Sequence, residues 1–188
     1  MRALSLYIAV IMVVLAGPVA AQERPDPELV ELLREAASDT DSFNDHFDAQ
    51  VWLTDMSARL ERQVEDPEER IDILKRVHQE AKRADLAPEL VLAVIDVESN
   101  FDKYAISVAG ARGLMQIMPF WLNEIGRPDD NLIHIGTNLR FGCTILKYYL
   151  EMEGGDLNRA LGRYNGSLGK RKYPNKVLDK LRLKWYRV

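Results

Sequence analysis

The segment Pro88–Ser99 constrains the fold of this chain more than any other part of the sequence. It reads Pro-Glu-Leu-Val-Leu-Ala-Val-Ile-Asp-Val-Glu-Ser, and a helix formed by it is apolar on nearly all sides. Such a helix has to be buried among other elements, whereas a surface helix carries a single apolar stripe. We therefore expect this segment to be the central helix of the fold.

Two acidic residues near the end of this segment, Asp96 and Glu98, should play different roles. Successive residues of a helix are about 100° apart around its axis, so side chains two positions apart point about 200° apart. The two carboxylates therefore cannot work as a pair. We expect Asp96 to be a structural carboxylate with its own partners on the far side of the helix.

The remaining sequence also predicts helices, and we find no convincing alternating strand pattern, so the expected fold class is all-α. Asp-Pro pairs at residues 26–27 and 66–67 place a capping side chain before a proline, which favours a helix start. An apolar stripe at roughly helical spacing is formed by Phe43, Phe47, Val51, Met56 and Leu60. We expect helices near residues 26–37, 43–64, 66–84, 88–98, 138–152 and 156–165, and a last one that begins at Pro174.

The N-terminal end is typical of a secretory signal peptide. A positive start is followed by an apolar run from Leu4 to Ala16, a Gly-Pro break, and small residues up to Ala21 where cleavage is expected. The run is shorter than the roughly 20 residues that span a membrane, which favours cleavage over an uncleaved anchor. We expect a signal peptide at residues 1–21, an acidic helical extension at 22–65, a main domain at 66–188 without a membrane span, and an exported, periplasmic or wall-associated protein.

Charge is distributed unevenly along a chain whose formal net charge is −4. Residues 23–69 hold 15 acidic and 4 basic side chains, whereas residues 170–188 hold 8 basic and 1 acidic. Solvated helix faces explain most such asymmetry, but a basic end also attracts acidic polymers, such as cell-wall glycan with carboxylate-bearing peptides. Nucleic acid is not an expected partner of an exported chain that is acidic overall.

Residues that commonly bind metals or act as thiol nucleophiles are sparse. Cys143 is the single cysteine, and its spacing from neighbouring apolar residues suits the buried face of a helix, which indicates a structural thiol. His46, His78 and His134 are scattered and show none of the usual ligand spacings. We expect neither a metal nor a cofactor.

Glu98 is the residue whose surroundings point most directly to chemistry. Apolar surroundings raise the pKa of a carboxyl group because they disfavour its charged form. A carboxylic acid that is still protonated near neutral pH can donate a proton to a leaving group. A glutamate at a helix end can equally form a salt bridge or face solvent, and composition alone does not separate these alternatives.

Two later segments suggest a sugar-binding groove. Gly113–Pro119 combines glycine, which allows a close turn, with apolar side chains and the amide of Gln116, a mixture that suits amide-bearing sugars. Tyr164-Asn165-Gly166 places a phenol beside an amide after a capped helix. A buried methionine-rich turn and an Asn-Gly helix end are the structural alternatives.

In their order and spacing, Glu98-Ser99, Gly113–Pro119 and Tyr164-Asn165 resemble the motifs of the soluble lytic transglycosylase (SLT) catalytic domain, a family related to goose-type lysozyme. The resemblance covers about residues 71–180. It implies a lysozyme-like helical fold and non-hydrolytic cleavage of the MurNAc–GlcNAc β-1,4 bond in the glycan strands of peptidoglycan, which leaves a 1,6-anhydro-muramoyl end.

Carried over by position, the resemblance implies that Glu98 is the catalytic acid/base. It also implies a substrate-binding set that consists of Ser107, Met115, Gln116, Tyr164 and Asn165. The chain departs from the family pattern on both sides of Tyr164-Asn165, with Leu-Gly-Arg before it and Gly166-Ser167 after it, and these departures concern the far subsites. Two other functions stay open: a hydrolytic lysozyme with Asp102 or Asp129 as second carboxylate, and a non-catalytic wall-binding module.

Overall fold

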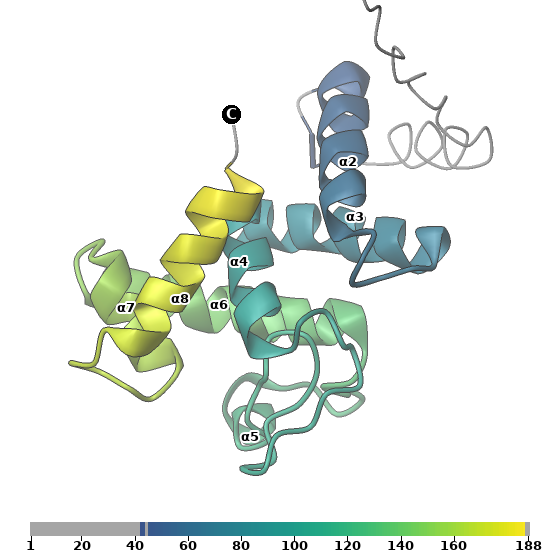
Figure 1. Cartoon of the computed structure of the whole chain (residues 1–188). Coiled ribbons are helices and arrows are strands. Elements are labelled where there is room, and N and C mark those ends of the chain that lie inside the picture. Colours follow the sequence, from purple (N-terminus) through teal and green to yellow (C-terminus); the bar gives the residue numbers. More distant parts are fainter. Residues whose placement is uncertain (1–41, 44, 187–188) are drawn as a thin grey trace, which may run out of the picture.

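The computed structural model describes residues 42–43 and 45–186, and the regular structure in this range is helical (Figure 1). Only isolated β-bridges occur there, joining Arg112 to Ile106 and to Ile117, so the all-α prediction is confirmed. The predicted signal peptide and the helix at 26–37 lie outside the described residues. No helix in the described range is long and apolar enough to cross a membrane. The elements are α2 (His46–Leu60), α3 (Pro67–Arg83), α4 (Pro88–Glu98), α5 (Trp121–Ile125), α6 (Ile135–Met152), α7 (Leu157–Tyr164), α8 (Lys172–Lys180) and the π-helical turn η1 (Leu181–Trp185).

Several helix starts follow from capping side chains that the sequence displays. The Asp66 carboxylate accepts a hydrogen bond from the Glu68 amide at 3.0 Å, with Pro67 in the first helical position of α3. The Asp156 carboxylate accepts one from the Arg159 amide at 3.1 Å at the start of α7. A capping side chain satisfies amides that have no partner within the helix. Two other helices begin earlier than the sequence predicts. Helix α6 begins three residues earlier, at Ile135, and α8 begins at Lys172, ahead of Pro174.

Helix α4 is the central helix, as the sequence predicts. Its residues from Val91 to Ile95 have no exposed surface, and α3, α8 and η1 pack around it. Figure 1 shows α4 between α8 and α3, with its C-terminal end facing the long loop that carries α5. The catalytic candidate Glu98 is the last residue of this helix.

Asp96 is a structural carboxylate, also as predicted. Its side chain has no exposed surface and forms ion pairs with Lys180 Nζ at 2.6 Å and with Lys184 Nζ at 3.0 Å. Gln63 Nε2 donates a further hydrogen bond to it at 3.3 Å. A buried carboxylate is tolerated only when it is paired and hydrogen-bonded. Asp96 therefore joins α4 to the end of α8 and to η1.

The apolar stripe predicted for the first described helix is confirmed at Met56 and Leu60, which are buried, and is wrong at Phe47 and Val51. Phe47 is 72% exposed and Val51 is 54% exposed, whereas Ala49 and Leu53 have no exposed surface. The buried positions repeat at intervals of three and four residues from Ala49 to Leu60, which is the face that α2 turns toward α3. These residues belong to the same apolar core as α4, and the predicted domain boundary at residue 66 stays a prediction.

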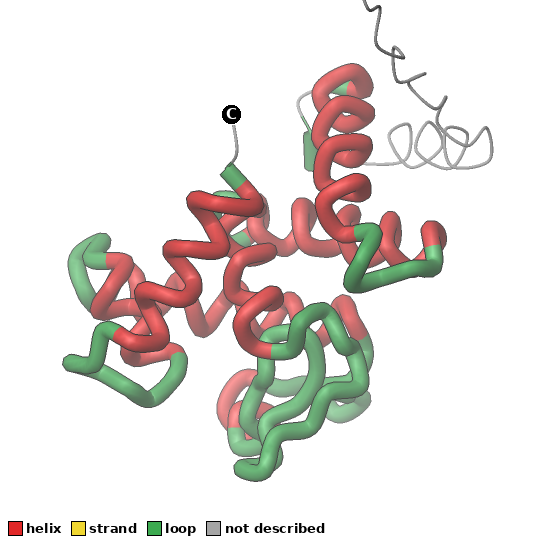
Figure 2. Tube along the Cα trace, in the orientation of Figure 1, coloured by secondary structure: helices red, strands yellow, loops and turns green. Residues whose placement is uncertain are grey.

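The chain between α4 and α6 consists mostly of loops, which gather at one end of the molecule (Figure 2). This region contains the segments singled out in the sequence, Ser107 and Gly113–Pro119. The short helix α5 inside it was not predicted, and five residues are too few to show an apolar periodicity.

Candidate active site

A pocket of about 350 Å³ opens beside the C-terminal end of α4. Three segments form it: the end of α4, the chain that follows α7, and the start of α8. Glu98 is the only carboxylate among the described residues that line it. The lining residues are Val97, Glu98, Asn165, Ser167, Lys170, Lys172, Tyr173 and Lys176.

The Glu98 carboxyl group is partly buried and held by two side chains from later in the sequence. The Tyr173 hydroxyl donates a hydrogen bond to Glu98 Oε1 at 2.6 Å, and Asn165 is a second hydrogen-bond partner. Burial raises the pKa of Glu98 above its ordinary value, and the hydrogen bonds from Tyr173 and Asn165 offset part of that rise. Glu98 therefore keeps its proton to a higher pH than an exposed glutamate, as a general acid requires.

Tyr164 lies next to this group but does not donate to it. Its hydroxyl donates to the Met115 carbonyl oxygen at 2.8 Å. Burial, and then the neighbouring Glu98, raise the pKa of Tyr164 well above its ordinary value, so the phenol stays neutral. The structure thus brings Glu98, Tyr164 and Asn165 together, and it adds Tyr173, which the sequence did not single out because no local pattern links it to Glu98.

The Gly113–Pro119 segment is held in place by one buried amide. Asn138, which is 1% exposed, accepts a hydrogen bond from the Met115 amide at 2.8 Å. Its amide nitrogen donates to the carbonyl oxygens of Arg112 at 2.8 Å and Leu132 at 2.7 Å. The Ser99 hydroxyl donates to the Leu114 carbonyl at 2.8 Å and so ties this segment to the end of α4. Asn138 and Ser99 are therefore positioning residues: Ser99 belongs to the Glu98-Ser99 motif, whereas Asn138 was not singled out in the sequence.

Met115 and Gln116 were expected to line the groove, and the structure gives both a supporting role. The Met115 side chain has no exposed surface, and its sulfur fills the space beside Gly142, so it belongs to the core and does not line the pocket. Gln116 has a positive φ of 51°. Its side-chain Nε2 donates to the carbonyl oxygens of Ala105 at 3.2 Å and of Gly113 at 3.0 Å. The Gln116 side chain therefore stabilises the turn that begins at Gly113.

Ser107 also takes part in a turn. Its hydroxyl accepts a hydrogen bond from the Ala111 amide at 3.1 Å, and its own amide donates back to the Ala111 carbonyl at 3.0 Å. It does not line the pocket around Glu98. A contact between Ser107 and substrate stays a prediction.

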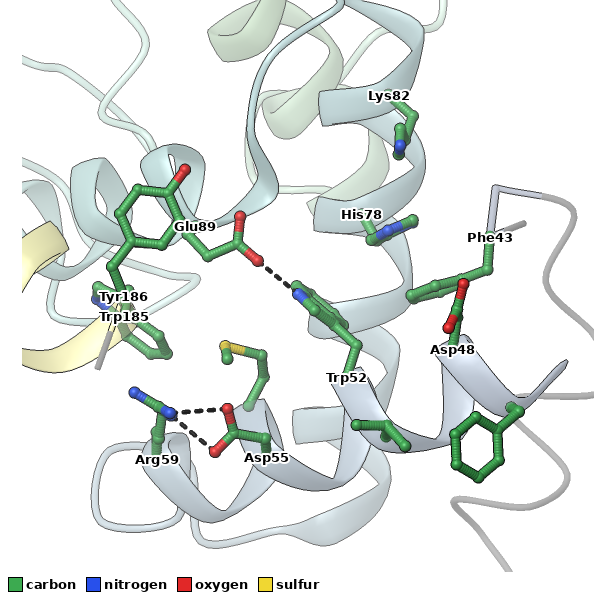
Figure 3. Close-up of a pocket in the computed structure, with 13 residues that line it drawn as sticks. Phe43, Asp48, Trp52, Asp55, Arg59, His78, Lys82, Glu89, Trp185 and Tyr186 are labelled. Carbon is green, nitrogen blue, oxygen red and sulfur yellow. Dashed lines mark hydrogen bonds and ion pairs between the residues drawn. The ribbon is translucent and has the colours of Figure 1, made fainter. Parts of the chain in front are cut away.

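A larger hollow of about 500 Å³ lies between α2 and the C-terminal end of the chain (Figure 3). The Trp52 indole donates to Glu89 Oε1 at 2.7 Å, and Arg59 is paired with Asp55. His78 stacks on Phe43 with ring centroids 3.5 Å apart, and burial, helped by the charge of Lys82, lowers the pKa of His78 to about 4. The Asp55 carboxylate is occupied by an ion pair, and the Glu89 carboxylate accepts the Trp52 indole. The pocket at Glu98 is the better candidate for an active site.

Residues that could hold a metal ion do not gather in the described part of the chain. No group of three or more His, Cys, Asp or Glu side chains is arranged there for a metal. Cys143 is fully buried, and burial raises the pKa of its thiol far above the ordinary value, in agreement with the predicted structural thiol.

The chain matches a known protein family over more than half of its length. The family described as "Transglycosylase SLT domain" matches residues 75–182, which include α4, the Gly113–Pro119 segment and Tyr164-Asn165. The chain belongs to this family. The match confirms the resemblance seen in the sequence.

Known proteins share parts of this SLT domain. The chain is 48% identical over 46 residues to a membrane-bound lytic murein transglycosylase C of Actinobacillus pleuropneumoniae serotype 5b (strain L20), which covers 24% of the chain and 13% of that protein. It is 32% identical over 105 residues to a transglycosylase of Enterobacteria phage PRD1, which covers 52% of the chain and 38% of that protein. A solved structure of an inactive mutant of the lytic transglycosylase Slt from Pseudomonas aeruginosa matches with a TM-score of 0.46 and 22% identity, over 86% of the chain and 32% of Slt. The chain therefore spans well under half the length of each of these proteins.

The hydrogen bond from Tyr173 leads to a prediction about the pKa of Glu98. In a Tyr173→Phe variant we expect the pKa of Glu98 to rise further, because the hydroxyl that stabilises its charged form is lost. An NMR titration of selectively labelled glutamate carboxyl carbons measures this directly. Tyr164→Phe is the matched control, since that hydroxyl donates to the Met115 carbonyl and its loss should move the Glu98 pKa much less. Equal shifts in the two variants would contradict the assignment.

Proposed function

We propose that this chain is a peptidoglycan lytic transglycosylase that cleaves the MurNAc–GlcNAc β-1,4 bond without water, with Glu98 as its acid and base. One observation carries the proposal. A partly buried glutamate with a raised pKa is the only carboxylate among the described residues that line its pocket. Membership of the SLT family agrees with this chemistry, and the relatives' names describe lytic murein transglycosylases.

The lack of a second carboxylate in the described lining favours help from the substrate. A retaining glycosidase of the common kind uses two carboxyl groups about 5 Å apart. Asp102 and Asp129, considered as second carboxylates, are exposed and do not line this pocket. The carboxylate of Asp102 accepts the Tyr104 amide at 2.8 Å, within its own turn. A hydrolytic lysozyme mechanism therefore has less support than substrate-assisted cleavage.

The proposed reaction takes two steps. The N-acetyl carbonyl oxygen of MurNAc attacks its own C1 while Glu98 gives its proton to the glycosidic oxygen, and the GlcNAc hydroxyl leaves. The 6-hydroxyl oxygen of MurNAc then attacks C1, the bond from C1 to the acetamido oxygen breaks, and the Glu98 carboxylate takes the 6-hydroxyl proton. The products are a 1,6-anhydro-muramoyl end and a regenerated acid. Tyr173 and Asn165 hold the carboxyl group during both transfers.

The products distinguish this function from its alternatives. We expect digestion of purified sacculi to release muropeptides with anhydro ends, which mass spectrometry separates from hydrolytic reducing ends by the mass of one water. Reducing ends would identify a lysozyme. A protein that binds sacculi and releases nothing would be a wall-binding module. The predicted signal segment would deliver the chain to the compartment that holds this substrate.

A further inference from the structure

Three lysines line the Glu98 pocket and form a group that we call the cationic rim: Lys170, Lys172 and Lys176. All three are exposed, and Lys172 and Lys176 are one turn apart on α8. Within the described part of the chain, none of them has an ion-pair partner.

Basic residues elsewhere in the described range are commonly paired. Lys103 pairs with Glu69 at 3.0 Å and Lys147 with Asp85 at 2.9 Å. Paired and unpaired lysines occur even within one helix. Lys180 of α8 forms an ion pair with Asp96 at 2.6 Å, whereas Lys172 and Lys176 line the pocket. The cationic rim is therefore not a set of charges satisfied by the fold.

The balance of charge in the pocket is opposite to that of the whole chain. The formal net charge of the protein is −4, yet three ammonium groups and a single carboxyl group line this pocket. Burial favours the neutral form of that carboxyl group, Glu98, so it offsets the positive charge only in part. Clefts lined by one sign of charge attract ligands of the opposite sign.

We propose that the cationic rim binds a carboxylate that the glycan carries on its muramoyl unit, so that the pocket selects acidic strands over neutral amino-sugar polymers. This inference rests on the proposed function. The carboxylate has two possible sources with the same chemistry. It belongs either to the stem peptide or, where the peptide is absent, to the free lactyl group of MurNAc.

Three glycans and two paired variants test the proposal. Two are substrates, namely peptide-bearing strands and amidase-treated strands that keep the lactyl carboxylate. The third is an N-acetylglucosamine oligosaccharide without carboxylates, which has no MurNAc unit and is used as a competing ligand. The test variant is Lys172→Gln/Lys176→Gln. The matched control is Arg62→Gln/Lys82→Gln, which removes two exposed positive charges away from the Glu98 pocket.

For the test variant we expect KM on an acidic strand to rise about tenfold at low salt, since an exposed charge contact is worth up to about 1 kcal/mol and there are two. The rise should shrink at high salt because the contacts are screened. The inhibition constant of the neutral oligosaccharide, measured against cleavage of an acidic strand, should rise at least fivefold less, and the control variant should leave KM unchanged. A rise confined to peptide-bearing strands assigns the contact to the stem peptide, and a rise that survives amidase treatment assigns it to the lactyl group.

Equal KM in the wild type and the test variant on both acidic strands would overturn the proposal, as would an equal rise in the inhibition constant of the neutral oligosaccharide. A second measurement, the binding of each variant to pelleted sacculi, distinguishes a wrong cationic-rim proposal from a wrong proposed function. If the wild type cleaves no substrate but the test variant alone binds sacculi about tenfold more weakly, the cationic rim stands and the catalytic function falls. If cleavage proceeds and the test variant matches the control, only the cationic rim is wrong.

Discussion

Replacement of Glu98 by glutamine should lower the rate of muropeptide release by about a thousandfold, the scale on which general acid catalysis operates. Glutamine keeps the shape of the side chain but has no proton to give, and in the described residues no other carboxylate lines the pocket to replace it. The measurement is release of anhydro-muropeptides from sacculi. Glu61→Gln, at an exposed position after α2, is the matched control and should keep wild-type activity.

The same variant should not lose stability. The pKa of Glu98 is raised in the folded protein, so its contribution to stability is present below the ordinary glutamate pKa and is lost as pH rises through the folded value. Glutamine has no such charged form. We therefore expect Glu98→Gln to be as stable as the wild type at acidic pH and at least as stable at neutral pH in thermal unfolding. An inactive variant that is also unfolded at neutral pH would leave the loss of activity without a catalytic meaning and contradict the burial argument.

Replacement of Gly113 by alanine should destabilise the fold by about 3 kcal/mol. Gly113 has a φ of +73°, which strains any residue with a side chain. A Cβ atom would also lie 2.6 Å from the Leu132 carbonyl oxygen and 2.4 Å from Asn138 Nδ2, the amide that holds the whole segment. Urea unfolding monitored by circular dichroism measures the change.

Gly110 supplies the matched comparison for Gly113. It has a similar positive φ of +86°, but a Cβ atom there meets nothing within 4 Å. Gly110→Ala should therefore show the backbone strain alone, about 1 kcal/mol. Equal losses of unfolding free energy in the two variants would mean that the close contacts with Asn138 and Leu132 do not contribute. The conclusion that Asn138 holds the Gly113–Pro119 segment in place would then be wrong.

Features that depend on neighbouring residues could be predicted from the sequence. The apolar run of α4, the caps at Asp66 and Asp156, and the division of roles between Asp96 and Glu98 all follow from local spacing and helical geometry. Glu98 and Asn165, which belong to the family motifs, line one pocket. Contacts between distant residues could not be predicted in this way, because Tyr173 lies 75 positions from Glu98 and no local pattern records the distance.

The motif Gly113–Pro119 shows a second limit of prediction from sequence. Its composition suggests a sugar-binding surface, but its Met115 side chain is in the core and its Gln116 amide closes a turn. Residue types that suit a ligand also suit a tight, hydrogen-bonded loop, and only the three-dimensional arrangement distinguishes the two. The same holds for Phe47 and Val51, whose apolar character alone placed them on the wrong face of α2.

Helix α8 is fastened to α4 at two points, by Tyr173 on Glu98 near its start and by Lys180 on Asp96 at its end. Lys176 lies between these points and Lys172 directly before the first, so the helix fixes the backbone positions of both relative to Glu98. Each residue along α8 adds about 1.5 Å. If the cationic rim binds a carboxylate on the strand, the geometry of α8 fixes the distance between that carboxylate and Glu98. This distance determines which glycosidic bond of the strand reaches Glu98.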